Sequence, residues 1–160
     1  MEKDKVLRER LVMLLRGGQA FQPLDELLKG ITVEAAGKTV QGLPYTLWQL
    51  VDHLRFALLD ILDFSRNPDY QEPNWPDDYW PKEKAPADQA ALDKSIQAIK
   101  TGMEEMIRLV EDPDNDLYTP FPHGNGQTLL REAMLVAEHN AYHLGQIVLM
   151  RRLLGEWEKV

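Results

Sequence analysis

Cysteine is absent from this sequence of 160 residues. Its absence excludes disulfide bonds, thiolate metal ligands and a cysteine nucleophile. Long hydrophobic runs are missing as well, since no apolar stretch reaches the roughly 18 residues that suggest a membrane span. The sequence begins MEKDKVLRER, and charge from the second residue onward is unlike a signal or transit peptide. We therefore expect a cytoplasmic protein that does not associate with a membrane.

Positive charge is also scarce. The chain has 18 Lys and Arg residues against 26 Asp and Glu residues, which gives a formal net charge of −8. Proteins that bind nucleic acid concentrate basic residues to neutralise phosphates, whereas here Arg151–Arg152 is the one local cluster. Nucleic acid is therefore not expected as a partner. The length and the 44% hydrophobic content are typical of one globular domain, which we assign to residues 1–160.

A strong helical pattern is present, with almost no indication of strands. Apolar residues recur at spacings of three and four, and this predicts four long helices, at residues 3–16, 46–66, 87–110 and 128–157. Thr46 and Gln49 fit a capping box at the start of the second long helix, and Asn67–Pro68 ends it. The core-facing side chains expected in that helix are Leu47, Leu50, Leu54, Leu58 and Ile61. The sequence therefore predicts an all-α protein.

A long connection separates the second and third predicted helices. Residues 67–88, NPDYQEPNWPDDYWPKEKAPAD, contain five prolines together with Tyr70, Trp75, Tyr79 and Trp80. A structureless segment of this length is uncommon in a compact domain and is usually functional or disordered. The aromatic residues favour an ordered cover, which either closes one end of the core or lies over a functional site.

Two histidines, His139 and His143, lie four residues apart in the last predicted helix. Both lie on an apolar face that we expect to point inward, together with Leu135, Tyr142, Gln146, Met150, Leu153 and Trp157. The spacing lets both imidazoles reach one metal ion, although Asn140 replaces the Glu of the HExxH pattern of metalloproteases. The alternative is a pair of core histidines whose ring nitrogens are hydrogen-bonded to protein groups.

A third histidine, His53, lies in the middle of the second long helix, at the edge of its apolar face. In a helix bundle this edge can face the last helix, and bundle metal sites are built from side chains on facing helices. Three histidine ligands would leave open positions on a metal, which is typical of catalytic sites. His53, His139 and His143 are therefore the candidate metal ligands. His123, in the connection FPHGNG, is expected to be an exposed loop residue.

The segments LWQLVDHLRFALLDILDFSRNP, NWPDDYWP and REAMLVAEHNAYHLGQIVLMRRLLGEW together resemble the DinB/YfiT-like superfamily. The resemblance extends from the second long helix to the C-terminus and is weaker before about Gly42. It implies an antiparallel four-helix bundle in which three histidines hold one divalent metal, and position by position these are His53, His139 and His143. The superfamily includes metal-dependent thiol S-transferases, an isomerase that acts with a low-molecular-weight thiol, and members without an assigned activity.

Two functions agree with these features. In the first, the protein is a metal-dependent transferase or hydrolase, in which zinc or nickel, or less readily iron or manganese, activates water or a low-molecular-weight thiol for chemistry on a small molecule. No catalytic residue is assigned: Tyr142 and Gln146 either orient a ligand or pack in the core, and Asp60 is expected in solvent. In the second, a stress-related bundle binds a metal or small ligand without catalysis. A deep cavity that reaches the metal would favour the enzyme, and a closed site with four ligands would favour the binding protein.

The last predicted helix is also apolar behind its histidine face, where it carries Leu130, Ala133, Met134, Ala137, Ala141, Leu144, Gly145 and Val148. A bundle helix normally turns charged residues outward at such positions. Small residues recur every four positions from Ala133 to Gly145 and form a low ridge that another helix can approach closely. That helix belongs either to the same chain or to a second copy, and we predict a homodimer.

Overall fold

The computed structural model describes residues 2–157. This part of the chain contains six helices and no strand, and the helices are α1 Glu2–Arg16, α2 Leu24–Leu28, α3 Val33–Ala36, α4 Leu47–Arg66, α5 Gln89–Glu111 and α6 Leu129–Leu153. Isolated bridges pair Thr39 with Thr46 and Pro120 with Thr128. The prediction of an all-α protein is therefore confirmed. None of the helices within residues 2–157 is long and apolar enough to cross a membrane.

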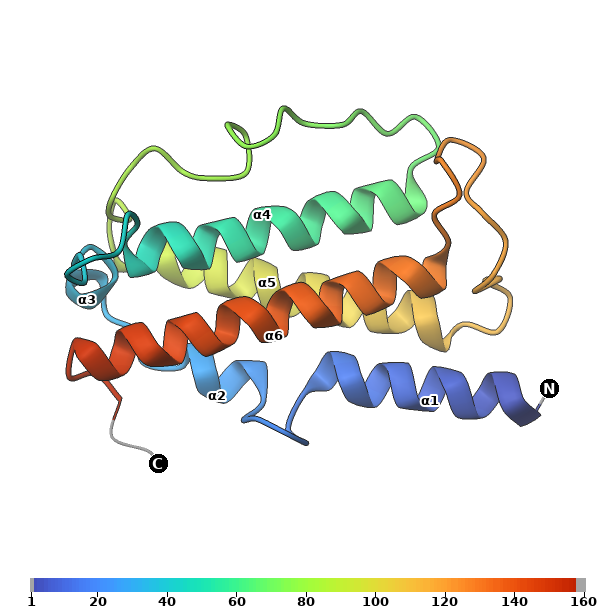
Figure 1. Cartoon of the computed structure of the whole chain (residues 1–160), viewed down its shortest axis with the longest axis horizontal. Helices are drawn as coiled ribbons and strands as arrows, with labels where there is room; N and C mark the ends of the chain where they lie inside the picture. Colours follow the sequence, from blue (N-terminus) through green and yellow to red (C-terminus); the bar gives the residue numbers. More distant parts are fainter. Residues whose placement is uncertain (1, 158–160) are drawn as a thin grey trace.

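The long helices α1, α4, α5 and α6 lie lengthwise in the molecule (Figure 1). α4 packs against α5 and α6, and α1 packs against the same two helices. The connection 67–88 returns along the length of α4, so α4 and α5 run in one direction, while α1 and α6 run in the opposite direction (Figure 1). Because α4 and α6 pack together with opposite directions, residues near the middle of each helix can meet.

α4 begins and is buried largely as its sequence predicts. The Thr46 side chain accepts a hydrogen bond from the Gln49 backbone N–H, and the Gln49 side chain accepts one from the Thr46 N–H, which completes the capping box. The helix contributes a row of leucines that are each at most 1% exposed, namely Leu47, Leu50, Leu54, Leu58 and Leu62. Each such leucine stabilises the fold by about 1.5–3 kcal/mol relative to full exposure. Ile61, expected in this row, is only partly buried, and Leu62 occupies the core instead.

α6 begins after Thr128, close to the predicted start of the last helix, and Thr128 is its N-cap, but the helix ends earlier than the sequence pattern suggests. The pattern extends to Trp157, whereas the helix stops at Leu153. Gly155 has a φ of +74°, a conformation that glycine adopts without steric cost. The Glu156 N–H then donates to the Arg151 carbonyl at 2.8 Å, which is a helix-ending contact. Trp157 therefore lies outside the helix, and its ring packs near the Arg151 guanidinium.

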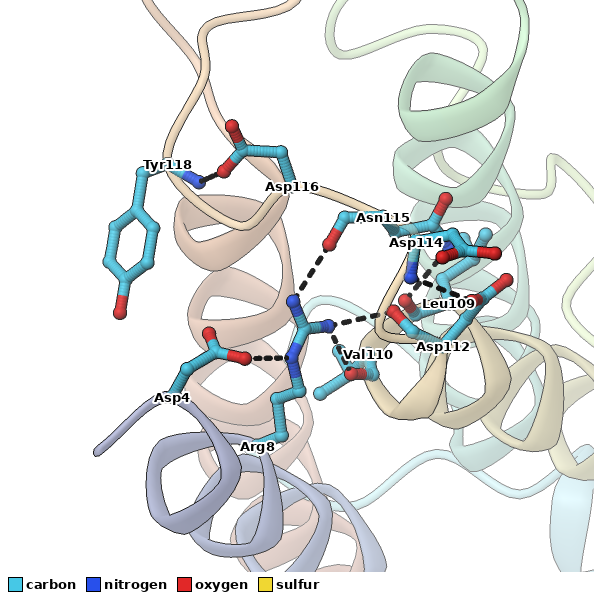
Figure 2. A network of polar contacts seen from close by, with 9 residues as sticks. All are labelled: Asp4, Arg8, Leu109, Val110, Asp112, Asp114, Asn115, Asp116 and Tyr118. Carbon is cyan, nitrogen blue, oxygen red and sulfur yellow. Dashed lines mark hydrogen bonds and ion pairs between the residues drawn. The ribbon is translucent and has the colours of Figure 1, made fainter. Parts of the chain in front are cut away.

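Arg8 joins the first helix to the end of α5 (Figure 2). Its side chain is 8% exposed, and its guanidinium donates to three backbone oxygens, at 2.8 Å to Val110, 2.9 Å to Asp112 and 2.8 Å to Asn115. The last carbonyls of an α-helix have no intrahelical partner and carry partial negative charge. Arg8 thus satisfies these groups from another helix, and Asp4 holds the guanidinium from one turn away at 2.8 Å.

The ridge of small residues on α6 has two environments. Ala133 and Ala137 are buried within the chain, at 0% and 8% exposure. Ala141 and Gly145 are exposed and line a pocket of about 560 Å³ beside residues 18–23. The first half of the ridge therefore packs against the same chain, and the predicted homodimer stays a prediction.

Candidate metal centre

His53 from α4 and His139 and His143 from α6 lie together where the two helices face each other. One ring nitrogen from each histidine lies within 4.8 Å of the corresponding nitrogens of the other two. The Nε2 atoms of His53 and His139 are 3.2 Å apart, although the residues are 86 positions apart in sequence. The structure thus brings together the three residues that the sequence singled out as candidate ligands.

Burial keeps these imidazoles neutral. His53 is 3% exposed and His143 is 7% exposed, while His139 is partly buried. Burial, which disfavours the charged imidazolium, lowers the pKa of all three side chains. The pKa of His139 falls to about 4, because the neighbouring His143 and His53 add to the effect of burial. At neutral pH each ring therefore keeps one nitrogen with a free lone pair.

Hydrogen bonds determine which ring nitrogen of His53 and of His143 is unprotonated. The His53 Nδ1 lies 2.9 Å from the backbone oxygen of Tyr79, which can only accept, so Nδ1 carries the proton. The His143 Nδ1 lies 2.7 Å from the Gln146 side-chain oxygen and is protonated for the same reason. Both rings are thus left with an unprotonated Nε2. An oxygen that accepts from the outer nitrogen is the usual companion of a metal-bound histidine.

The donor set fits a divalent metal. The His139 Nε2 lies at hydrogen-bond distance from the unprotonated Nε2 of His53, so a proton on His139, or a cation in its place, lies between the two nitrogens. A tetrahedral zinc ion, at about 2.0–2.1 Å from each ligand nitrogen, holds neighbouring nitrogens about 3.3 Å apart. The 3.2 Å separation of the His53 and His139 Nε2 atoms matches that spacing. Three neutral imidazoles on two opposed helices therefore offer donors that suit a divalent metal, and one of the three nitrogen pairs has the separation that a tetrahedral ion sets.

The comparison with protein families places this geometry in context. Residues 18–147, which are 130 of the 160 residues, match the model of the DinB superfamily. The chain belongs to the DinB superfamily. The matched segment contains all three histidines and the connection 67–88, and it begins earlier than the sequence resemblance near Gly42. No curated protein and no solved structure matches this DinB superfamily member.

The inward face of α6 is rotated relative to the sequence prediction. Tyr142 and Leu153, expected inside, are 65% and 62% exposed. The buried face instead contains Val136, Ala137, Asn140, His143, Leu144, Ile147 and Met150. The rotation follows from the packing, since α6 contacts α4 on one side and α1 and α2 on another. His139 consequently lies at the margin of the buried face, where its imidazole is partly accessible.

Asp60, expected in solvent, is a hydrogen-bond acceptor inside this DinB superfamily member. The Tyr70 hydroxyl donates to one carboxylate oxygen at 2.8 Å, and the Tyr79 hydroxyl donates to the other at 2.6 Å. Burial and the adjacent Asp60 carboxylate raise the pKa of both phenols, which therefore stay protonated donors. The sequence offered one signal for this role: Asp60 follows His53 by seven residues, and so lies on the same side of α4 two turns away.

A polar pocket of about 400 Å³ lies at this end of the α4 and α6 interface. Its lining includes Asp60, Tyr70, Tyr79, His123, Arg131 and Glu132, but none of the three clustered histidines. His123 is half-buried, contrary to the expectation of an exposed loop residue, and its Nε2 lies 2.8 Å from the Phe64 backbone oxygen. His123 is therefore a pocket residue that does not join the histidine cluster.

Proposed function

We propose that this DinB superfamily member holds one divalent metal through the Nε2 atoms of His53, His139 and His143. The observation that carries the proposal is the convergence of three neutral imidazoles, with ligand nitrogens within 4.8 Å of one another. Imidazole ligands suit zinc and nickel best, and iron and manganese less well, so zinc or nickel is the proposed metal. The proposal includes the arrangement of α1, α4, α5 and α6 as one four-helix-bundle domain, whose facing helices supply the ligands.

We further propose an enzymatic role in transfer or hydrolysis on a small molecule. A divalent metal held by three neutral ligands keeps its positive charge and lowers the pKa of a water or thiol bound to it. The histidines would hold this charge at a fixed place. Tyr79 and Gln146 accept hydrogen bonds from Nδ1 of His53 and His143, so the Nε2 atoms of these two rings stay unprotonated and free to bind the metal. The partly accessible His139 marks the side from which a small molecule approaches.

A low-molecular-weight thiol is the proposed co-substrate. The chain has no cysteine, so it supplies no thiolate of its own. The preference for a thiol rests on the superfamily resemblance, because a water molecule satisfies the same chemistry. The net charge of −8 disfavours nucleic acid and other polyphosphates as partners.

The second candidate is a metal- or ligand-binding protein without catalysis. It is favoured by one observation: the polar pocket at the α4 and α6 interface is not lined by the clustered histidines. A substrate in that pocket would not touch the metal directly. The two candidates share the metal site and differ in whether a reacting molecule reaches it.

The test begins with the metal content of the purified protein. Wild type should contain close to one equivalent of zinc or nickel, and His143→Ala should lose most of it. His123→Ala is the matched control, because His123 also forms a hydrogen bond through its ring but lies outside the cluster. Full metal retention by His143→Ala, or equal loss in both variants, would overturn the metal assignment.

Activity is then measured with the metal-loaded protein, a thiol such as bacillithiol, glutathione or cysteine, and an electrophilic acceptor. Metal-dependent turnover that His139→Ala abolishes supports the enzyme. Equal rates for wild type and His139→Ala across a broad panel of thiols and acceptors favour the binding protein instead.

A further inference from the structure

Residues 79–81 lie along one side of α4, and we call this segment the strap. We propose that the strap positions His53 for metal binding, with the Trp80 ring fixing the plane of the imidazole and the Tyr79 carbonyl fixing its tautomer. The inference rests on the proposed metal site and assigns a positioning role to residues that do not themselves bind the metal.

The strap follows a single row of α4 residues. Gln49, His53, Phe56 and Asp60 are spaced by three or four positions and so share one side of the helix. The Gln49 side chain donates to the Pro81 carbonyl at 2.9 Å, and at the other end of the row Asp60 accepts from the Tyr79 hydroxyl at 2.6 Å. Between them the Phe56 and Tyr79 rings meet at 5.1 Å between centroids. The strap is thus fastened on both sides of His53.

His53 receives two contacts from the strap, one on the face of its ring and one at its edge. The Trp80 ring stacks on the imidazole with centroids 3.9 Å apart and an angle of 4° between the planes. The Tyr79 carbonyl accepts from Nδ1 in the plane of the ring at 2.9 Å. The stack prevents the ring from tilting, and the hydrogen bond opposes rotation about the side-chain bond. Together they direct Nε2 toward His139.

Trp80 is itself held in place. Tyr45, just before α4, stacks on its ring with centroids 5.5 Å apart and planes at 29°. The far edge of Trp80 approaches His143 at 6.4 Å between centroids. Three aromatic rings therefore stack in the order Tyr45, Trp80 and His53, and the stack ends at the candidate metal site. The orientation of the His53 ring thus depends on tertiary packing.

Metal binding by the histidines and docking of the strap against α4 must favour each other to the same extent. If a docked strap favours metal binding by some factor, bound metal favours the docked strap by the same factor. The physical link is the imidazole, because withdrawal of electron density at Nε2 makes the Nδ1 proton a stronger donor to the Tyr79 carbonyl. The strap amides should therefore exchange hydrogen more slowly with metal present than without it.

The variant Trp80→Leu removes the stack, and Trp80→Phe keeps an aromatic ring at the position. Changes to groups that orient metal-binding histidines typically lower metal affinity about 10- to 100-fold. We expect a loss of zinc affinity in that range for Trp80→Leu, together with a changed visible spectrum of the cobalt-substituted protein, which reports ligand geometry. Trp80→Phe should have a zinc affinity and a cobalt spectrum close to those of wild type. Trp75→Leu is the matched control from the same connection, since Trp75 is 68% exposed and its ring contacts Tyr79 rather than a histidine.

Wild-type zinc affinity and an unchanged cobalt spectrum in Trp80→Leu would overturn the proposal. A second measurement decides the matter if that variant does not fold. In metal-free wild type, nitrogen-15 NMR should show His53 protonated at Nδ1, and zinc should slow the exchange of the Tyr79 and Trp80 amide hydrogens. The opposite tautomer, or exchange that zinc leaves unchanged, contradicts the role of the strap. If His139→Ala binds zinc like wild type, the metal site itself fails, and the tautomer of His53 still tests the strap.

Discussion

The guanidinium of Arg8 on α1 donates to the backbone oxygen of Val110 on α5 at 2.8 Å, across 102 positions of sequence. It is one of three carbonyls, at the end of α5 and in the turn that follows, to which this single side chain donates. A charged residue of the first helix therefore serves as the C-terminal cap of a helix far away in the chain.

The Arg8→Met variant should be strongly destabilised. Methionine fills similar space but donates nothing, and hydrogen bonds from charged groups contribute about 1.5–3 kcal/mol each when they are not compensated by water. We expect a loss of about 2–4 kcal/mol in the free energy of unfolding, because water reaches part of the vacated site. Urea denaturation of wild type and Arg8→Met measures this difference in the free energy of unfolding. Arg10→Met on the exposed side of the same helix should change the value by less than about 0.5 kcal/mol, and equal effects of the two substitutions would refute the capping role.

Gly102 permits the close approach of α5 to α4. A Cβ atom there would lie 3.0 Å from Leu58 Cδ2 and 3.3 Å from Leu62 Cδ1, and both leucines are at most 1% exposed. Gly102→Val should therefore lower the free energy of unfolding by about 1–3 kcal/mol through overpacking. Gly145→Val is the matched control, because nothing lies within 4 Å of a Cβ at that helical position. Compared at a concentration at which both proteins are monomeric, its thermal midpoint should equal or exceed that of wild type; a loss like that of Gly102→Val would show that glycine matters there for another reason.

Glu132 should make stability depend on pH. Its side chain is 2% exposed, and burial together with Asp60 across the interface on α4 raises its pKa, while the partly exposed Arg131 opposes the rise. With a pKa higher in the folded than in the unfolded state, the folded chain binds protons more tightly. The contribution of Glu132 to stability is then fully present below the usual carboxyl value of 4.5 and is lost as pH rises through the folded pKa.

The Glu132→Gln variant tests this sign, since it removes the ionisation. Relative to wild type it should gain stability between acid and neutral pH, and the two proteins should differ least in acid, where Glu132 is protonated. Urea denaturation at several pH values measures the difference. A variant whose deficit grows toward neutral pH would show that the ion pair with Arg131 outweighs the cost of burial.

The outer side of α6 provides the test of the homodimer. Exposed apolar residues follow it along its length, including Met134 at 53%, Leu149 at 56% and Leu153 at 62%. In soluble proteins, large exposed apolar residues that gather on one helix face are candidates for an interaction site. Light scattering at tens of micromolar should report a dimer for wild type and a monomer for Leu149→Glu. A monomeric wild type at that concentration rules out the homodimer.

Much of the local structure could be predicted from the sequence because it depends on neighbouring residues. The capping box of Thr46 and Gln49, the start of the last helix near Thr128 and four of the five buried leucines of α4 follow from spacing. The approach of His139 to His143 follows for the same reason, since a helix places positions four apart on one side. The end of α6 was the exception, because an apolar residue at position 157 continues the pattern past the glycine that stops the helix.

Only the tertiary structure decided how these elements meet. Nothing near His53 in the sequence specifies that Tyr79 and Trp80 contact its ring, nothing near Arg8 indicates the end of α5, and the exposure of Tyr142 depends on how α6 is rotated against its neighbours. Periodicity fixes which residues share a side of a helix, but the helix as a rigid body can rotate and slide. The sequence by itself therefore determined the helices and the histidine pair. Long-range packing determined the third histidine's position, the strap that holds it and the part of α6 that stays exposed, because these depend on contacts between segments tens of residues apart.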